Sequence, residues 1–203
     1  MILYMIRHGE TDWNLQHKLQ GMTDIPLNAN GRRAAELTRD GLQNVKFDVA
    51  FSSPLIRAKE TADIILEGRD VDIILDERIR EVGFGTFEGT NSSEFAEGIK
   101  KFFTQPECFV ATNGAESYES LLERERSFWN DLCTNSEYQD STILIATHGA
   151  ALNGLLCVIK DKEIADFWKC GLHKNCGMTI VEVTNGEAKF LQEAIILYNE
   201  KDL

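Results

Sequence analysis

The stretch Ile2-Leu3-Tyr4-Met5-Ile6-Arg7-His8-Gly9-Glu10 passes directly from an apolar run into a polar cluster that contains a histidine. A short apolar run that ends in polar residues is typical of a buried strand. In open α/β sheets, ligands bind beyond the carboxyl ends of the strands. We therefore expect Ile2–Ile6 to form an interior strand, with Arg7 and His8 at a ligand site.

Two further apolar runs end in the same manner. Phe47–Phe51 leads into Ser52-Ser53-Pro54-Leu55-Ile56-Arg57, and Thr142–Ala146 leads into Thr147-His148-Gly149. If the three strands are parallel neighbours, their carboxyl ends meet at one edge of the sheet. Two arginines and two histidines then converge on one crevice.

Segments with helical periodicity separate the predicted strands. The pattern predicts helices over Gly31–Leu42, Leu55–Leu66, Glu94–Phe103, Ser117–Cys133 and Ala150–Ile159. The remaining strands are expected over Val71–Leu75, Met178–Val183 and Ala188–Leu197, and Asn185-Gly186 is typical of a tight hairpin turn between the last two. This alternation indicates an α/β fold with three α/β/α layers, and the hairpin makes the mostly parallel central sheet mixed. We expect residues 1–203 to form a single domain.

The composition excludes several classes of partner. The chain has 203 residues, with 33 acidic residues against 21 Lys and Arg, and a formal net charge of −12. Binding to nucleic acid or to anionic membranes needs a basic surface, so neither partner is expected. No apolar run reaches the roughly 18 residues of a membrane span. The N-terminus lacks the basic start of a signal peptide, and the odd number of cysteines favours reduced thiols, so a cytoplasmic location is expected.

The converging side chains favour a phosphate ligand. A guanidinium presents a planar fork of donors that matches phosphate oxygens, and an imidazole serves as nucleophile, acid or base near neutral pH. Two arginines and two histidines supply more positive charge than one carboxylate needs. The cluster therefore suits a phosphate dianion in an otherwise acidic chain.

The sequence resembles the histidine phosphatase superfamily, the phosphoglycerate-mutase-like proteins. The resemblance covers most of the chain and is weakest between about residues 91 and 116. It rests on an ordered series of segments: Arg7-His8-Gly9-Glu10-Thr11, Leu19-Gln20-Gly21, Pro26-Leu27-Asn28, Ser52-Ser53-Pro54-Leu55-Ile56-Arg57-Ala58, Arg80-Glu81-Val82-Gly83-Phe84-Gly85, Phe87-Glu88-Gly89 and Thr147-His148-Gly149.

The resemblance implies a role for each matching residue. His8 is the implied nucleophile, which becomes a phosphohistidine, and Glu81 is the implied proton donor to the leaving oxygen. The remaining implied site residues are those that hold the phosphoryl oxygens, Arg7, Arg57 and His148, and those that line the pocket, Asn14, Gln20 and Gly21. His148 is expected to be protonated against the phosphate dianion, and Glu81 to keep its proton through desolvation or the phosphate charge. The implied substrate is a small-molecule phosphomonoester, and no metal or other cofactor is implied.

Three functions remain open. The first is a phosphatase, the second is a phosphoglycerate mutase, and the third is a non-catalytic binding module on the same fold. The segment Glu81-Val82-Gly83-Phe84-Gly85 resembles the phosphatase branch, and the insert that follows offers only Lys100-Lys101 as paired cations. The sequence therefore favours the phosphatase, and homo-oligomerisation stays open.

The insert at residues 91–116 is expected to form the rim or lid of the pocket. Four rings are candidates for an apolar rim or, alternatively, for the core: Phe95, Phe102, Phe103 and Phe109. His17 and His173 lie outside any motif, so ordinary surface or core positions are favoured for both. Ser117 is expected to cap the helix that follows it.

Overall fold

The central sheet is described by a computed structural model that covers residues 1–169 and 171–203. Within these residues the sheet has six strands in the order β3-β2-β4-β1-β5-β6. Their bounds are β1 Ile2–Arg7, β2 Val49–Ser52, β3 Ile73–Leu75, β4 Thr142–Thr147, β5 Met178–Thr184 and β6 Glu187–Ile195.

The sheet is mixed, as the sequence predicts. β3, β2, β4 and β1 are parallel, whereas β5 runs antiparallel to both β1 and β6. Asn185 and Gly186 join β5 to β6 with φ angles of 53° and 81°, as a hairpin turn with two left-handed residues requires. In register, Ile6 pairs with Ala146 and Ala146 pairs with Ser52. The carboxyl ends of β1, β4 and β2 are therefore level with one another.

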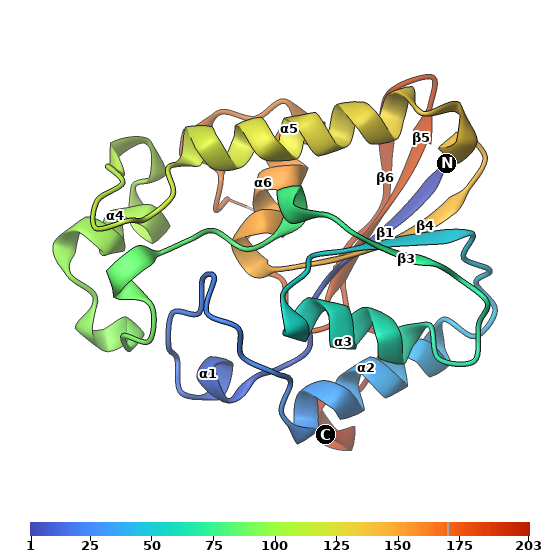
Figure 1. Ribbon diagram of the computed structural model, residues 1–203, viewed down its shortest axis with the longest axis horizontal. Coiled ribbons are helices and arrows are strands. Elements are labelled where there is room, and N and C mark those ends of the chain that lie inside the picture. Colours follow the sequence, from blue (N-terminus) through green and yellow to red (C-terminus); the bar gives the residue numbers. More distant parts are fainter. Residues whose placement is uncertain (170) are drawn as a thin grey trace.

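Helices cover both faces of the sheet, which confirms the three-layer architecture. They are α1 Asp12–Leu15, α2 Ala29–Gly41, α3 Ile56–Ile65, α4 Glu97–Thr104, α5 Tyr118–Thr134 and α6 Gly149–Lys160. Figure 1 shows α2 and α3 on one side of the sheet, α5 and α6 on the other, and α4 beyond the end of the sheet. No described helix is both long and apolar enough to cross a membrane.

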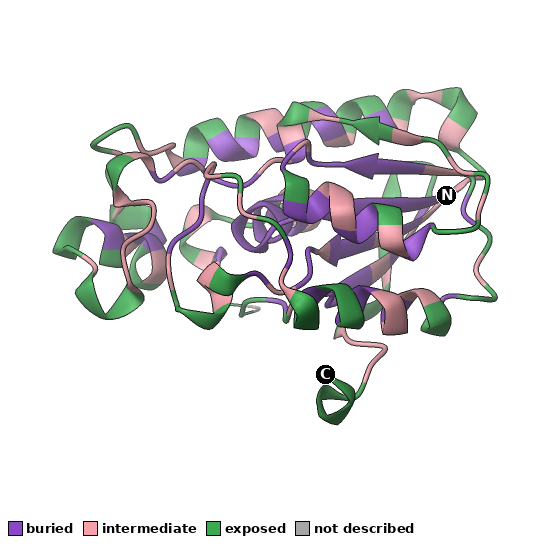
Figure 2. Cartoon of the chain, turned by 60° about the horizontal axis from the view of Figure 1, so that its bottom comes forward, coloured by how far each residue is buried: buried purple, intermediate pink, exposed green. Residues whose placement is uncertain are grey.

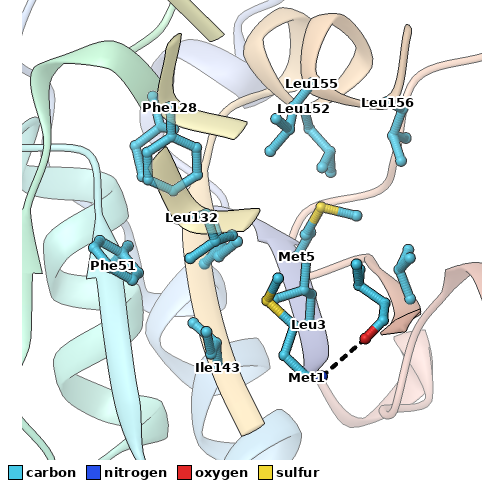
Figure 3. Packing of buried hydrophobic residues seen from close by; sticks show 14 residues of the cluster. Met1, Leu3, Met5, Phe51, Phe128, Leu132, Ile143, Leu152, Leu155 and Leu156 are labelled. Atoms are coloured by element: carbon cyan, nitrogen blue, oxygen red, sulfur yellow. Dashed lines mark hydrogen bonds between the residues drawn. The ribbon is translucent and has the colours of Figure 1, made fainter. Parts of the chain in front are cut away.

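Successive side chains of β1 point alternately into the hydrophobic clusters on the two faces of the sheet. Leu3 and Met5 pack toward Leu152 and Leu155 of α6, as Figure 3 shows, whereas Ile6 belongs to the cluster beneath α2 and α3. This follows from the two-residue period of a strand. In Figure 2 the inner strands are largely buried, whereas the edge strands β3 and β6 and the outer faces of the helices are largely exposed or half-buried. A third cluster joins α4 to α5 and α6.

Several element boundaries differ from the sequence expectation by two or three residues. β2 and β3 begin at Val49 and Ile73, where their register with neighbouring strands begins. The predicted helix over Glu94–Phe103 begins only at Glu97, because residues 92–94 form a separate 3-10 turn. Ser117 accepts the amide of Ser120 as the N-cap of α5, as expected.

Candidate active site

A cavity of about 800 Å³ opens beyond the carboxyl ends of the parallel strands. Seven of the residues expected in the site line it: Arg7, His8, Asn14, Gln20, Gly21, Arg57 and Glu81. The eighth, His148, is fully buried behind this lining, with its ring centroid 5.2 Å from that of His8. The structure thus brings the two arginines and two histidines together, with Arg7, His8 and Arg57 on the cavity wall and His148 behind them.

His8 follows β1 and presents one ring nitrogen for chemistry. Its Nδ1 lies 2.6 Å from the carbonyl oxygen of Gly9. A carbonyl only accepts, so Nδ1 carries the proton and a neutral ring has its lone pair on Nε2. Burial lowers the pKa of His8 well below its usual value, and the nearby cations of Arg57 and Arg7 lower it further. His8 is therefore poised as a neutral imidazole.

Arg7 is held from one side only. Its Nη1 donates to the carbonyl of His173 at 2.5 Å, while its buried Nε has no hydrogen-bond partner among the described residues. Gly149 lies against this guanidinium, since a Cβ there would be 3.6 Å from Nε. A buried donor without a partner suits an anion in the adjacent pocket.

Arg57 and His148 are joined by a hydrogen bond. Arg57 Nε donates to Nδ1 of His148 at 3.1 Å, and Nε2 of His148 lies 2.7 Å from Oγ of Ser53. Since an arginine only donates, Nδ1 has no proton, and the ring carries its one proton on Nε2. Burial and then the Arg57 cation lower the pKa of His148 well below its usual value. The expectation of a charged His148 is not met, because its neighbour occupies the second nitrogen.

Thr11 orients the two amide side chains of the pocket. Its hydroxyl lies 3.1 Å from Oδ1 of Asn14 and 3.0 Å from Oε1 of Gln20. Asn175 donates from Nδ2 to the carbonyl of His8 and to Oδ1 of Asn14. Because these contacts engage both amide oxygens, the NH₂ groups of Asn14 and Gln20 are left as donors to a ligand.

Glu81 sits at the N-terminus of α6. Its carboxylate accepts the amides of Val82 and Ala151 at 3.0 Å each and that of Ala150 at 3.3 Å. Backbone donors at a helix N-terminus stabilise an ionised carboxylate. These three amides fix the carboxyl group of Glu81 in the cavity wall. Arg124 also holds the backbone of Glu81, because its Nη2 donates to the Glu81 carbonyl at 3.3 Å.

The insert forms part of the pocket wall, but only some of its aromatic rings reach the cavity. Phe95 and Phe103 line the cavity, whereas Phe102 is fully buried and Phe109 packs against the third cluster. Phe102 stacks on Tyr118 with ring centroids 4.6 Å apart. Of the two alternatives that the sequence leaves open, Phe95 and Phe103 fit the rim, Phe102 belongs to the core, and Phe109 packs against that core without lining the cavity.

The lysines and histidines outside the motifs also differ in whether they line the cavity. Lys100 lines the cavity and Lys101 does not, although they are adjacent on α4. His17 is exposed at the cavity wall, with a left-handed φ of 54°. His173 is buried, which lowers its pKa to about 4. Among the described residues, no group of three or more His, Cys, Asp and Glu is arranged to hold a metal ion.

Three contributors were not singled out in the sequence. Thr11 and Ser53 stand within the motif segments, so their position was a usable signal. Asn175 lies in a loop before β5 and had no motif around it, yet it lines the cavity. Its part in the site depends on the antiparallel packing of β5 beside β1.

Residues 3–195 match the sequence model of the histidine phosphatase superfamily (branch 1). The chain belongs to the histidine phosphatase superfamily. Among its relatives, the uncharacterized phosphatase PhoE of Bacillus subtilis is 38% identical over 156 residues, which cover 76% of this chain and 75% of PhoE. The probable phosphoglycerate mutase GpmB of Escherichia fergusonii is 32% identical and covers 77% of this chain and 74% of GpmB.

Solved structures of histidine phosphatases have the same fold. YhfR of Bacillus stearothermophilus superposes with a TM-score of 0.89 at 30% identity, over 96% of this chain and 97% of YhfR. A His→Ala variant of phosphoserine phosphatase from Entamoeba histolytica, in complex with phosphoserine, gives a TM-score of 0.81 at 30% identity, over 94% and 95% of the two chains. Family, fold and relatives together support an enzyme that acts on phosphates.

Proposed function

We propose that the protein is a metal-independent phosphomonoesterase that hydrolyses small organic phosphates through a phosphohistidine at His8. The observation that carries this proposal is the placement of a neutral His8 ring on the cavity wall, which it shares with Arg7 and Arg57. Its Nδ1 is tied to the Gly9 carbonyl, so Nε2 is the nitrogen available for attack.

Binding places the phosphoryl group among fixed donors. Arg7 offers its unpartnered Nε, and Arg57 offers the terminal N–H groups that its protein contacts leave over. The NH₂ groups of Asn14 and Gln20 add neutral donors. In this scheme the charge that builds up on the phosphoryl oxygens is stabilised by preorganised side chains.

Transfer to His8 and hydrolysis share one carboxyl group. Nε2 of His8 attacks phosphorus while the bond to the ester oxygen breaks, and Glu81 donates its proton to that oxygen. The negative charge of the bound phosphate favours a proton on Glu81 at this stage. Water then attacks phosphorus, Glu81 accepts its proton, the P–N bond breaks and inorganic phosphate leaves with His8 restored.

A neutral His148 acts as a positioning group in this scheme. Its Nδ1 accepts from Arg57, and its ring stands beside that of His8. It therefore fixes the side of Arg57 that faces the nucleophile. The scheme does not require a charge on His148.

The cavity wall favours substrates with an apolar body. Phe84, Phe95, Phe103 and Trp168 line the cavity together with Leu172. A volume of about 800 Å³ exceeds that of a phosphate group and leaves space for an organic substituent. We propose small aryl or alkyl phosphates as the preferred class of substrate.

A mutase is the second candidate, because GpmB is among the relatives and Lys100 offers one cation on the cavity wall. A mutase would return the phosphoryl group from His8 to a second hydroxyl of a phosphoglycerate. Only one of the paired lysines of the insert reaches the cavity, which favours the hydrolase.

The deciding experiment measures phosphate release from an aryl phosphate and from 3-phosphoglycerate with a chelator present. Wild type and His8→Ala are compared, and unfolding temperatures verify that both are folded. We expect wild-type hydrolysis and a loss of at least about 10³-fold in the variant. Exchange between 2- and 3-phosphoglycerate without hydrolysis would establish the mutase instead. Equal activity in both proteins would exclude His8 as the nucleophile.

A further inference from the structure

Arg57 takes its orientation from a loop rather than from its own helix. Its Nη2 donates to the carbonyl of Gly21 at 2.7 Å, and its Nη1 donates to the carbonyl of Thr23 at 2.9 Å. These two carbonyls and Nδ1 of His148 are all the described acceptors of the guanidinium. The direction in which Arg57 faces the cavity therefore depends on where the loop carbonyls point.

Glu88 holds the opposite side of the same loop. Its Oε1 accepts the amides of Met22 at 2.9 Å and Phe84 at 3.0 Å, and its Oε2 accepts the amide of Thr23 at 2.9 Å and the Thr23 hydroxyl. Four donors thus share the two oxygens of one carboxylate. Glu88 is half-buried and does not line the cavity, so it does not itself face the ligand.

One peptide plane connects Glu88 to Arg57. The Met22 amide and the Gly21 carbonyl belong to the same peptide bond, and in a trans peptide these groups point in opposite directions. When Glu88 holds the N–H on one side, the C=O must face Arg57 on the other. The position of the Glu88 carboxylate therefore determines the direction of the Gly21 carbonyl, and this carbonyl orients the guanidinium of Arg57.

Gly21 makes this close approach possible. Its φ is +54°, and a Cβ at this position would lie 2.2 Å from Oε1 of Glu88. A side chain at Gly21 would thus exclude the carboxylate from the Met22 amide. Expected from the sequence only as a pocket residue, Gly21 has a second reason to be glycine.

We propose that Glu88 is a positioning residue, which fixes Arg57 through the Gly21–Met22 peptide and thereby sets the phosphoryl-binding end of the cavity. This inference rests on the proposed function for the role of Arg57. Loss of Glu88 does not remove a residue from the cavity lining. It leaves the carbonyls of Gly21 and Thr23, which hold Arg57, free to change direction. Binding of any phosphoryl group weakens as a result, independently of the organic part of the substrate.

Glu88→Gln tests the proposal, because a glutamine keeps one acceptor oxygen but turns an NH₂ group toward two of the four donors. We expect the inhibition constant of inorganic phosphate to rise, and kcat/KM on an aryl phosphate to fall, each by roughly 10- to 100-fold, the scale of a small misplacement in a binding site. Glu60→Gln is the matched control. Glu60 also accepts an amide of this loop, that of Leu27 at 3.2 Å, but it has no described hydrogen bond to residues 21–23, whose carbonyls hold Arg57.

The NMR resonance of Arg57 distinguishes a change in the orientation of this side chain from a general loss of structure. The ¹H–¹⁵N resonance of Arg57 Nε should shift or broaden in Glu88→Gln and stay in place in Glu60→Gln. If Glu88→Gln fails to fold, Thr23→Val and Thr23→Ser replace it, since valine lacks the hydroxyl that Glu88 accepts and serine retains it. The valine variant should then show the weaker phosphate binding, and the serine variant should match wild type.

The outcomes distinguish this proposal from the proposed function. Unchanged phosphate affinity and an unchanged Arg57 resonance in Glu88→Gln would overturn the positioning role, as would equal effects of Thr23→Val and Thr23→Ser. A wild-type protein that neither hydrolyses phosphate esters nor binds inorganic phosphate would contradict the proposed function. In that case the Arg57 resonance still decides whether Glu88 fixes the guanidinium.

Discussion

Nε of Arg57 donates to Nδ1 of His148, and this one contact at 3.1 Å determines the protonation state of a buried imidazole. A donor on Nδ1 excludes a proton there, so His148 is neutral although it lies in a cluster that suits an anion. His8 is neutral as well, since burial and two guanidinium groups lower its pKa. The positive charge of the site therefore resides on the arginines.

Both imidazoles should stay neutral in mildly acidic solution. Burial lowers the pKa of His8 and of His148 well below their usual value, so neither ring gains a proton as the pH falls through 6.5. Side-chain ¹⁵N shifts recorded between pH 7.5 and 5.5 should keep the values of neutral rings, with free histidine in the sample as the reference. A midpoint near 6.5 for either ring would contradict the neutral site.

Phe103→Ala and Phe102→Ala should have different effects, although the two residues are adjacent. Phe103 lines the cavity, so its loss should change the ratio of kcat/KM between aryl and short alkyl phosphates. Phe102 is fully buried against Tyr118, so its loss should instead lower the free energy of unfolding by about 3–5 kcal/mol. The measurements are substrate ratios and urea unfolding. Unchanged ratios in Phe103→Ala would remove that ring from the rim.

Thr11→Val should impair binding without changing any group that faces the ligand. Valine has nearly the shape of threonine but lacks the hydroxyl next to the amide oxygens of Asn14 and Gln20. With those amides free to rotate, kcat/KM should fall by roughly 10- to 100-fold. Thr11→Ser retains the hydroxyl and should stay close to wild type. Equal losses in both variants would point to packing of the methyl group instead.

Glu125 should make the protein less stable as the pH rises. The residue is fully buried on α5, neither of its oxygens has a hydrogen-bond partner among the described residues, and desolvation raises its pKa well above the usual value. The folded state therefore retains a proton that the unfolded chain releases above about pH 4.5, so the free energy of unfolding falls with pH by up to about 1.4 kcal/mol per unit.

Glu125→Gln removes this titration, so the stability of the variant relative to wild type should increase between pH 5 and pH 8. Urea unfolding at several pH values measures the difference. Glu123→Gln, at an exposed position on the same helix, should show a constant difference. A constant difference for Glu125→Gln as well would mean that Glu125 titrates in the folded protein as it does in the unfolded chain.

The sequence predicted the site where a buried strand passes abruptly into polar residues. Ile2–Ile6 before Arg7, and Thr142–Ala146 before His148, follow this pattern, and parallel pairing brings them together. Side-chain orientation was not accessible in this way. The charge of His148 depends on whether Arg57 donates to one of its ring nitrogens. The side chain that reaches the cavity, Phe103 rather than Phe102, depends on the rotation of α4 about its axis.

The sequence pattern also does not reveal site residues whose contacts are made with distant parts of the chain. Asn175 reaches His8 only because β5 packs antiparallel to β1, and the polar residues around it form no recognisable spacing. Glu88 was seen within a motif, but nothing in its neighbourhood along the chain pointed to the loop amides that it accepts.

The position of β4 in the sheet determines when, during synthesis of the chain, the cleft can form. β4 lies between β1 and β2 although it is synthesised long after both of them. A nascent chain that has emerged only as far as residue 140 contains His8 and Arg57 but lacks the strand that spaces them. Pairings between sequence-distant strands form slowly. The cleft is therefore completed only after β4 has been synthesised, so shorter translation products should not hydrolyse phosphate esters.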